Sequence, residues 1–214
     1  MTALAGYKAN VYFSTGVSTP FTNMSMTDAG DHMTFTASVS AQRYLDPNQP
    51  LTVQTAPDGV TWTTVTTGFT VQYCGGVIVF ASSVAGGTPS CRISAGNYLV
   101  FSQAGQAFSI DVQTTINKLD NTTFASAQAN NGFITQQAGL GGHTWKLSNW
   151  HIDNFFFSQA GNLVLISAYT GANANQRLEG YGLLTGDNIK IDIKALNQED
   201  LTVDGSGPIY WIAS

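Results

Sequence analysis

The sequence predicts an all-β protein, a β-sandwich with one short flanking helix. Apolar and polar residues alternate along most of the chain, which is typical of half-buried strands. Clusters of turn-forming residues recur about every ten residues, the spacing of a sandwich or small barrel. Charged residues make up only 10% of the 214 residues. Thr, Ser, Asn, Gln and Gly replace them, and a chain of this length buries a sizeable core.

Strands are predicted first in the N-terminal half. Pro57-Asp58-Gly59 is a strong turn sequence, and Cys74-Gly75-Gly76 predicts a tight hairpin between two apolar runs. The runs that predict strands are residues 8–14, 33–39, 51–55, 61–66, 69–73, 77–81 and 91–94.

The pattern changes after a cluster of small and polar residues over 97–107, which predicts a junction. Residues 117–140 lack apolar periodicity and predict a long loop that orders only on assembly. Asp153 is expected to cap a short helix over 154–159 that ends at Gly161. Residues 189–194 alternate Ile with Lys or Asp, so the Ile face should meet a core. Further strands are predicted over 108–114, 143–152, 163–169, 176–184, 189–194, 201–204 and 209–211.

The charge balance argues against tight nucleic-acid binding. The net charge is −5, and no run of Lys or Arg occurs. Phosphate neutralisation needs such runs, whereas a mildly acidic surface repels DNA. The first residues lack the pattern of a signal peptide, and no apolar stretch is long enough to span a membrane. We therefore expect synthesis in the cytoplasm and no membrane span.

The weakly charged surface favours a protein packed against neighbours, because burying Thr or Gln costs less than burying Lys or Glu. The alternative is a secreted or viral β domain that simply favours Thr and Ser. Cys74 and Cys91 allow a disulfide or two free apolar thiols, and they form no zinc site.

Candidate ligands for a metal are scarce. His32, His143 and His151 are far apart in sequence and are expected to be surface or hydrogen-bonded residues. Asp28 and Asp31 flank a Gly, which permits weak calcium binding but predicts a turn, because the other ligands of a calcium loop are missing. No metal site is predicted.

Catalytic motifs are absent as well. There is no G-x-S-x-G sequence, and Gly180-Tyr181-Gly182 with Gly186 lacks the spacing of a dinucleotide loop. The two Glu residues, Glu179 and Glu199, suggest no glycosidase pair. No catalytic residue and no cofactor is predicted, so an enzyme is not expected.

Four aromatic residues leave a second possibility open. One alternative is that they line a carbohydrate or peptide groove, but their strand positions favour core or interface packing. These residues are Trp145, Trp150, Tyr181 and Tyr210.

The second half resembles a known family over residues 108–211. The N-terminal residues 3–12 are similar to the arm and first strand of the same family. The matching residues are Phe108-Ser109-Ile110-Asp111-Val112, Thr123-Phe124, Gly139-Leu140, Trp145-Lys146-Leu147, Leu163-Val164-Leu165, Arg177-Leu178-Glu179-Gly180-Tyr181-Gly182 and residues 201–210. In this order and spacing they resemble the tail tube (major tail) proteins of long-tailed, non-contractile bacteriophages.

The resemblance implies a division of the chain. Residues 1–16 correspond to the N-terminal arm and first strand, and residues 101–214 to a tail-tube-like β-sandwich. Residues 17–100 depart from the minimal family pattern. Their hairpin over 70–80 and their ending over 91–98 look like a β module found in several phage virion proteins, which is a possible insertion.

The resemblance also implies a function. In this family six copies form a ring, long hairpins join into a β-barrel around a lumen, and stacked rings form a conduit for DNA. The implied partners are further copies and other tail proteins in the virion, with DNA passing unbound and no cofactor. Candidate lumen or interface charges are Asp111, Asp120, Glu179 and Asp192. The alternatives are another tail ring protein (terminator or tip), a carbohydrate-binding β-sandwich, and an unnoticed hydrolase.

Overall fold

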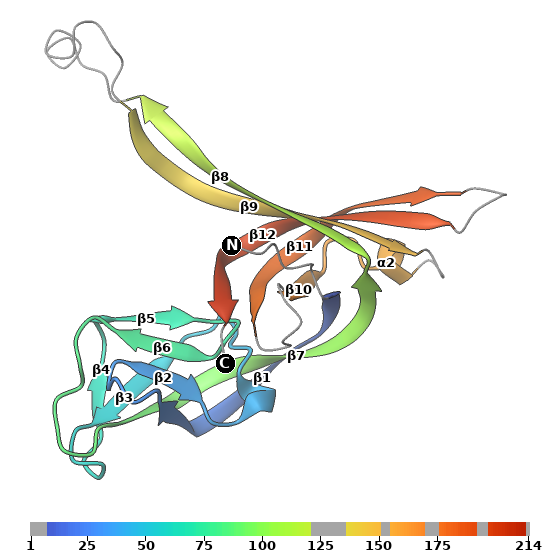
Figure 1. Cartoon of the computed structure of the whole chain (residues 1–214). Helices are drawn as coiled ribbons and strands as arrows, with labels where there is room; N and C mark the ends of the chain where they lie inside the picture. The colour runs from blue at the N-terminus through green and yellow to red at the C-terminus, as the bar shows by residue number, and fades with distance from the viewer. Residues whose placement is uncertain (1–7, 121–135, 151–154, 170–175, 192–196, 213–214) are drawn as a thin grey trace, which may run out of the picture.

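The computed structural model describes residues 8–120, 136–150, 155–169, 176–191 and 197–212. Within them the prediction of an all-β fold is confirmed (Figure 1). The strands are β1 (Lys8–Asp28), β2 (Thr34–Ala37), β3 (Thr52–Ala56), β4 (Thr63–Val65), β5 (Phe69–Gln72), β6 (Val77–Phe80), β7 (Ser90–Ala107), β8 (Ser109–Asp120), β9 (Gln136–Trp150), β10 (Leu163–Tyr169), β11 (Arg177–Lys190) and β12 (Gln198–Ile212).

All strand pairs are antiparallel, and they form one curled sheet in the order β4-β3-β7-β1-β10-β11-β12-β9-β8. At its far end β1 also pairs with β2, which leads through β6 to β5. Buried side chains from β1, β2, β3, β6 and β7 share one apolar cluster, so the N-terminal part is a small sandwich. A second cluster fills the curled sheet of the C-terminal part around Trp145 and Val164.

Two long strands connect these clusters. β1 contributes Phe13 to the C-terminal cluster and Phe21 to the N-terminal one. β7 runs antiparallel to β1. It contributes Ile93 to the N-terminal cluster and Ala107 to the C-terminal one. The predicted domain boundaries after residues 16 and 100 fall within these two strands.

The junction predicted over residues 97–107 is wrong, because this segment is the second half of β7. Its small and polar residues pair with β1 across two register shifts, one beside Val11 and one between Ser14 and Ser18. Such bulges let a strand bend while keeping most of its backbone hydrogen bonds. A run of small residues therefore marks a bend in this strand and not its end.

The prediction of a long loop over residues 117–140 is wrong at both ends of that range. β8 continues to Asp120 and β9 begins at Gln136, and these two residues are paired in register. Backbone pairing satisfies N–H and C=O groups whatever the side-chain pattern, so a strand can continue where apolar periodicity stops. Residues 121–135 lie outside the described part.

The predicted short helix is confirmed as α2 (Phe155–Ser158). Phe156 is its buried residue, and Phe155 packs edge-on against Phe13 with ring centroids 5.4 Å apart. Gly161 follows with φ 83°, a conformation that glycine adopts without strain. The expected cap, Asp153, lies outside the described residues.

The expectation that the Ile residues of 189–194 face a core is wrong for Ile191, which is 78% exposed. β10 pairs with β11 only as far as Leu183, so the end of β11 extends past the core. A salt bridge of 2.5 Å between Lys190 and Asp200 joins β11 to β12 there.

We predict that Gly182→Ala destabilises the fold. A Cβ atom at this position would lie 2.5 Å from Val203 and 2.7 Å from the backbone oxygen of Asp204 on the neighbouring strand. We expect overpacking to lower the free energy of unfolding by about 2 kcal/mol, measured by urea denaturation. Gly87→Ala is the matched control, because a Cβ there meets nothing within 4 Å. Equal stability of the two variants would contradict the proposed close packing of β11 on β12.

Candidate assembly surface

The hairpin of β8 and β9 extends beyond the rest of the sheet (Figure 1). β12 pairs with β9 only from Thr144 to Trp150. Toward Gln136, β9 pairs with β8 alone. This outer part is a two-stranded ribbon, and an isolated ribbon of this kind is marginally stable in water. A further contact would stabilise it.

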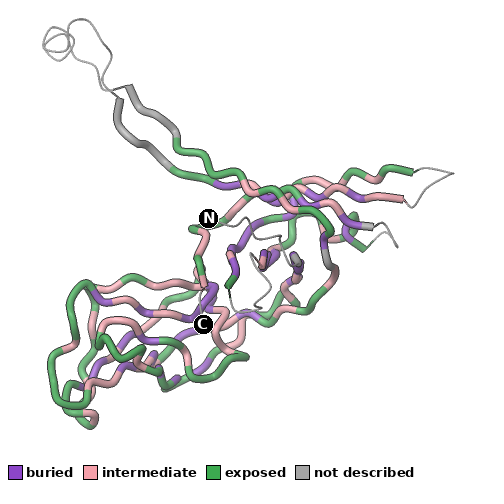
Figure 2. The backbone as a smooth tube through the Cα atoms, viewed as in Figure 1, coloured by how far each residue is buried: buried purple, intermediate pink, exposed green. Residues whose placement is uncertain are grey.

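β8 is also an edge strand. It is the last strand of the sheet order, and no strand in the described part of the chain pairs with its outer side. Its outward N–H and C=O groups form a template for another strand. Phe108, immediately before β8, is 50% exposed and Ile116 on β8 is 60% exposed. Figure 2 shows that most of the ribbon's residues coloured by burial are exposed.

The four predicted interface charges lie in different surroundings. Asp111 is exposed on β8, directly opposite Lys146 of β9. Asp120 ends β8 and pairs with Gln136. Asp192 lies outside the described residues. Glu179 is fully buried within the chain, so the structure places it in the interior and not on a surface of the subunit.

Glu179 is the centre of a buried charge cluster. Its Oε1 atom accepts hydrogen bonds from Arg177 Nε at 2.6 Å, Ser167 Oγ at 2.8 Å and Arg43 at 3.1 Å. Arg177 lies two residues away on the same face of β11, and Ser167 of the neighbouring strand β10 is paired directly with Glu179. Arg43 comes from the N-terminal sandwich and also donates to the Tyr44 hydroxyl. The cluster thus joins two parts of the chain that are distant in sequence.

Tyrosine side chains reinforce the same contact. The Tyr181 hydroxyl donates to the backbone oxygens of Leu45 at 3.2 Å and Tyr73 at 3.4 Å. The Tyr210 hydroxyl donates to the oxygen of Val71 at 3.2 Å. Burial raises the pKa of Tyr181 well above its usual range, so its hydroxyl stays protonated and able to donate. Tyr181 and Trp145 are therefore buried inside the molecule, and Tyr210 is half-buried against the apolar cluster that contains Tyr181.

A cavity of about 540 Å³ lies at the base of the ribbon, where β9 diverges from β12. His143 lines it and is only 7% exposed. Its Nε2 atom has no hydrogen-bond partner within the described residues, and its ring fills the space above Gly205. Burial lowers the pKa of His143, while a hydrogen bond with the Tyr181 backbone acts in the opposite direction.

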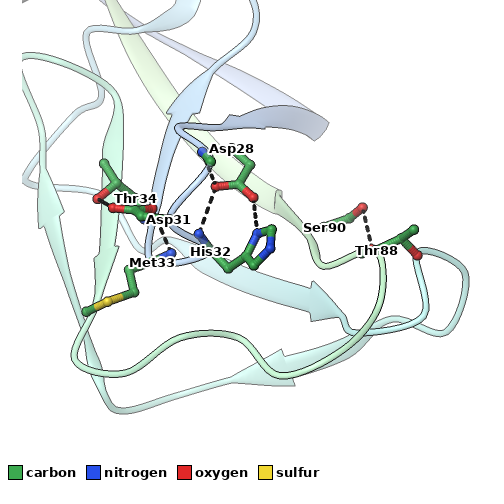
Figure 3. A network of polar contacts seen from close by, with 8 residues as sticks. Asp28, Asp31, His32, Met33, Thr34, Thr88 and Ser90 are labelled. Carbon is green, nitrogen blue, oxygen red and sulfur yellow. Dashed lines mark hydrogen bonds and ion pairs between the residues drawn. The ribbon is translucent and has the colours of Figure 1, made fainter.

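The Asp28–Asp31 segment is a turn, as predicted (Figure 3). Asp28 accepts from the backbone N–H groups of Gly30 at 2.9 Å and His32 at 3.1 Å, and it pairs with His32 Nδ1 at 2.5 Å. Asp31 accepts hydrogen bonds from the backbone N–H groups of Met33 and Thr34 and from the Thr34 hydroxyl. These hydrogen bonds lower the pKa of both carboxyl groups. The described residues include no group of three ligands that would hold a metal ion.

Both cysteines are free and buried, in different apolar clusters. Burial raises the pKa of Cys91 to about 12 and that of Cys74 further. The interpretation of the two as apolar thiols is therefore confirmed. Of the helices in the described ranges, none has the length and apolarity to cross a membrane.

Comparison with known proteins gives partial similarities of two kinds, to a family model and to solved structures. Residues 33–112 match the model of a family described as the cleaved adhesin domain. Among solved structures, a chain from the virion of a native gene transfer agent particle is 13% identical with a TM-score of 0.41, over 53% of this chain and 89% of that chain. No curated protein sequence matches.

We predict that Glu179→Gln destabilises the protein strongly. The substitution leaves Arg177 buried without its counter-charge, and breaking a buried ion pair costs about 3 kcal/mol or more. Urea denaturation followed by tryptophan fluorescence measures the loss. Asp111→Asn removes an equal charge from an exposed site and should change stability by less than about 0.5 kcal/mol. Similar losses in both variants would show that the cluster does not hold the two parts together.

We predict that His143 makes the fold less stable in mild acid. Its folded pKa lies below the ordinary 6.5, so the unfolded chain binds the proton more readily. Stability is therefore fully present above about pH 6.5 and declines as the pH falls below it. His143→Asn should flatten this decline in urea denaturation between pH 7 and pH 5. The same pH dependence in the variant would contradict the assignment.

Proposed function

We propose that this chain is a virion structural protein, a tail tube subunit without enzymatic activity. In this proposal the ribbon of β8 and β9 joins neighbouring copies into rings, and stacked rings form a conduit for viral DNA. The observation that carries the proposal is the open outer edge of β8 on a ribbon that extends beyond its own sheet. Strand addition from another copy would pair these backbone groups and remove the edge.

The charge pattern supports assembly through this surface. Only 10% of the residues are charged, so few charges would lose water in contacts between copies. The net charge of −5 suits a lumen through which DNA slides without binding. Ring formation needs a head-to-tail contact that closes by rotation, and six copies per ring is the number that the resemblance to tail tube proteins implies.

The rigid body of the subunit supports the same role. The cluster around Glu179 and the hydroxyl bonds of Tyr181 and Tyr210 join the N-terminal sandwich to the C-terminal sheet. A fixed body presents the ribbon in one direction, which repeated assembly requires. Localisation in the virion tail, with other tail proteins as neighbours, belongs to this proposal.

A tail terminator or tip ring protein is the closest alternative. It would share the edge-to-edge contacts but stop after a single ring. Negative-stain microscopy of the concentrated protein separates the two, since hollow rods of varied length indicate a tube subunit and single rings indicate a terminator. A protein that remains monomeric at high concentration would contradict both.

We predict that Ile116→Lys prevents assembly. A lysine on the edge strand places a strongly hydrated charge in the proposed contact, a common means of blocking edge-to-edge pairing. Val60→Lys is the matched control. It introduces the same charge at a residue that is 77% exposed in a turn of the N-terminal sandwich, away from β8. Sedimentation velocity should show assemblies for the control and monomers for Ile116→Lys. Assembly of both variants to the same extent would exclude the edge of β8 as the contact.

A further inference from the structure

A row of polar side chains crosses the N-terminal sandwich on the strands β4, β3, β7 and β1. Thr64 is paired with Gln54, Gln54 with Arg92, and Arg92 with Ser25. Residues paired in register point to the same face of a sheet. The four side chains therefore form one continuous line across four strands.

This line faces outward. The residues next to it along the strands are buried in the N-terminal cluster, which fixes the opposite face as the inner one; they are Val53, Ile93 and Met24. Thr64 and Ser25 are exposed, and Gln54 and Arg92 are half-buried. The row is thus available to a partner from solution.

The row is held rigidly by its own contacts. Arg92 Nε donates to Gln54 Oε1 at 2.8 Å, and Gln54 Nε2 donates to Thr64 Oγ1 at 3.2 Å. The guanidinium carbon of Arg92 lies 4.2 Å from the ring centroid of Trp62. Groups fixed before binding lose little conformational entropy when a ligand arrives. An aromatic ring, a guanidinium, an amide and hydroxyls are therefore preorganised on one surface.

The donors of this surface are not exhausted. A guanidinium carries five N–H groups, and the bond to Gln54 uses the one on Nε. In the described part of the chain, the terminal nitrogens of Arg92 have no carboxylate within salt-bridge distance, since Arg43 and Arg177 are the arginines that form ion pairs. The row itself contains no acidic residue.

We propose that the surface formed by Trp62, Arg92, Gln54 and Thr64 binds carbohydrate. The Arg92 guanidinium covers one face of the Trp62 ring, so a pyranose would pack its apolar face of C–H groups on the opposite face of the indole. The hydroxyls around the rim of the pyranose would pair with the guanidinium, amide and hydroxyl groups of the row. Nucleic acid is disfavoured, because one arginine on a chain of net charge −5 neutralises few phosphates. A protein partner would need an apolar centre, which this polar row lacks.

The proposal does not depend on the assembly function. Its residues lie on β3, β4, β7 and the segment before β4, and none belongs to β8 or β9. The surface would equip an assembled particle, or a single chain, to attach to a glycan-covered surface. Failure of one proposal leaves the other intact.

A glycan array of neutral and acidic bacterial oligosaccharides, probed with the full-length protein, tests the inference. We expect retention on at least one oligosaccharide class, and Trp62→Ala should weaken titration with that oligosaccharide at least tenfold. Trp211→Ala is the control, because Trp211 is 53% exposed on β12, outside this row. No retention by the wild-type protein, or equal affinity of Trp62→Ala and wild type, would overturn the proposal.

Arg92→Lys separates geometry from charge. Lysine keeps the positive charge but loses the planar stack on Trp62 and the Nε bond to Gln54. We expect at least a fivefold loss of affinity with an unchanged melting temperature, which shows that the variant is folded. Unchanged affinity would reject the preorganised row. Ile116→Lys should bind the oligosaccharide as wild type does, whether or not it assembles.

Discussion

The buried carboxylate of Glu179 is the interaction on which the arrangement of the whole chain depends. It lies on β11, yet one of its partners, Arg43, belongs to the N-terminal sandwich. Desolvating these charges is costly unless each is paired, so the two parts can meet only in the register that brings the arginine to the carboxylate. Apolar packing around Tyr181 gives adhesion, while the charge cluster selects a single orientation. The direction of the projecting ribbon follows from that orientation.

Strand patterns in the sequence were sufficient to predict the all-β class, the short helix at Phe155–Ser158 and the turn at Asp28. They rest on local rules: side-chain alternation, capping and turn chemistry. The lengths of β7, β8 and β9 were not predictable in this way. Their continuations are stabilised by backbone pairing with distant strands, and that pairing leaves little trace in side-chain periodicity.

The candidate surfaces show the same contrast between features set by local sequence and features set by distant residues. Asp111 lies in the alternating run over residues 108–114, and the strand predicted there accounts for its exposed position on β8. Glu179 stands in a similar run, but its surroundings are set by Arg43, which is 136 positions away. The row from Thr64 to Ser25 was missed for the same reason, since its members come from four strands and only the register of the sheet aligns them.

The two long strands β1 and β7 have a consequence for how the molecule comes apart. Each contributes side chains to both apolar clusters, so neither cluster can melt without withdrawing strands from the other. The chain therefore has separate apolar clusters but unfolds as a single cooperative unit, and mechanical load applied to one end is carried through the sheet to the other.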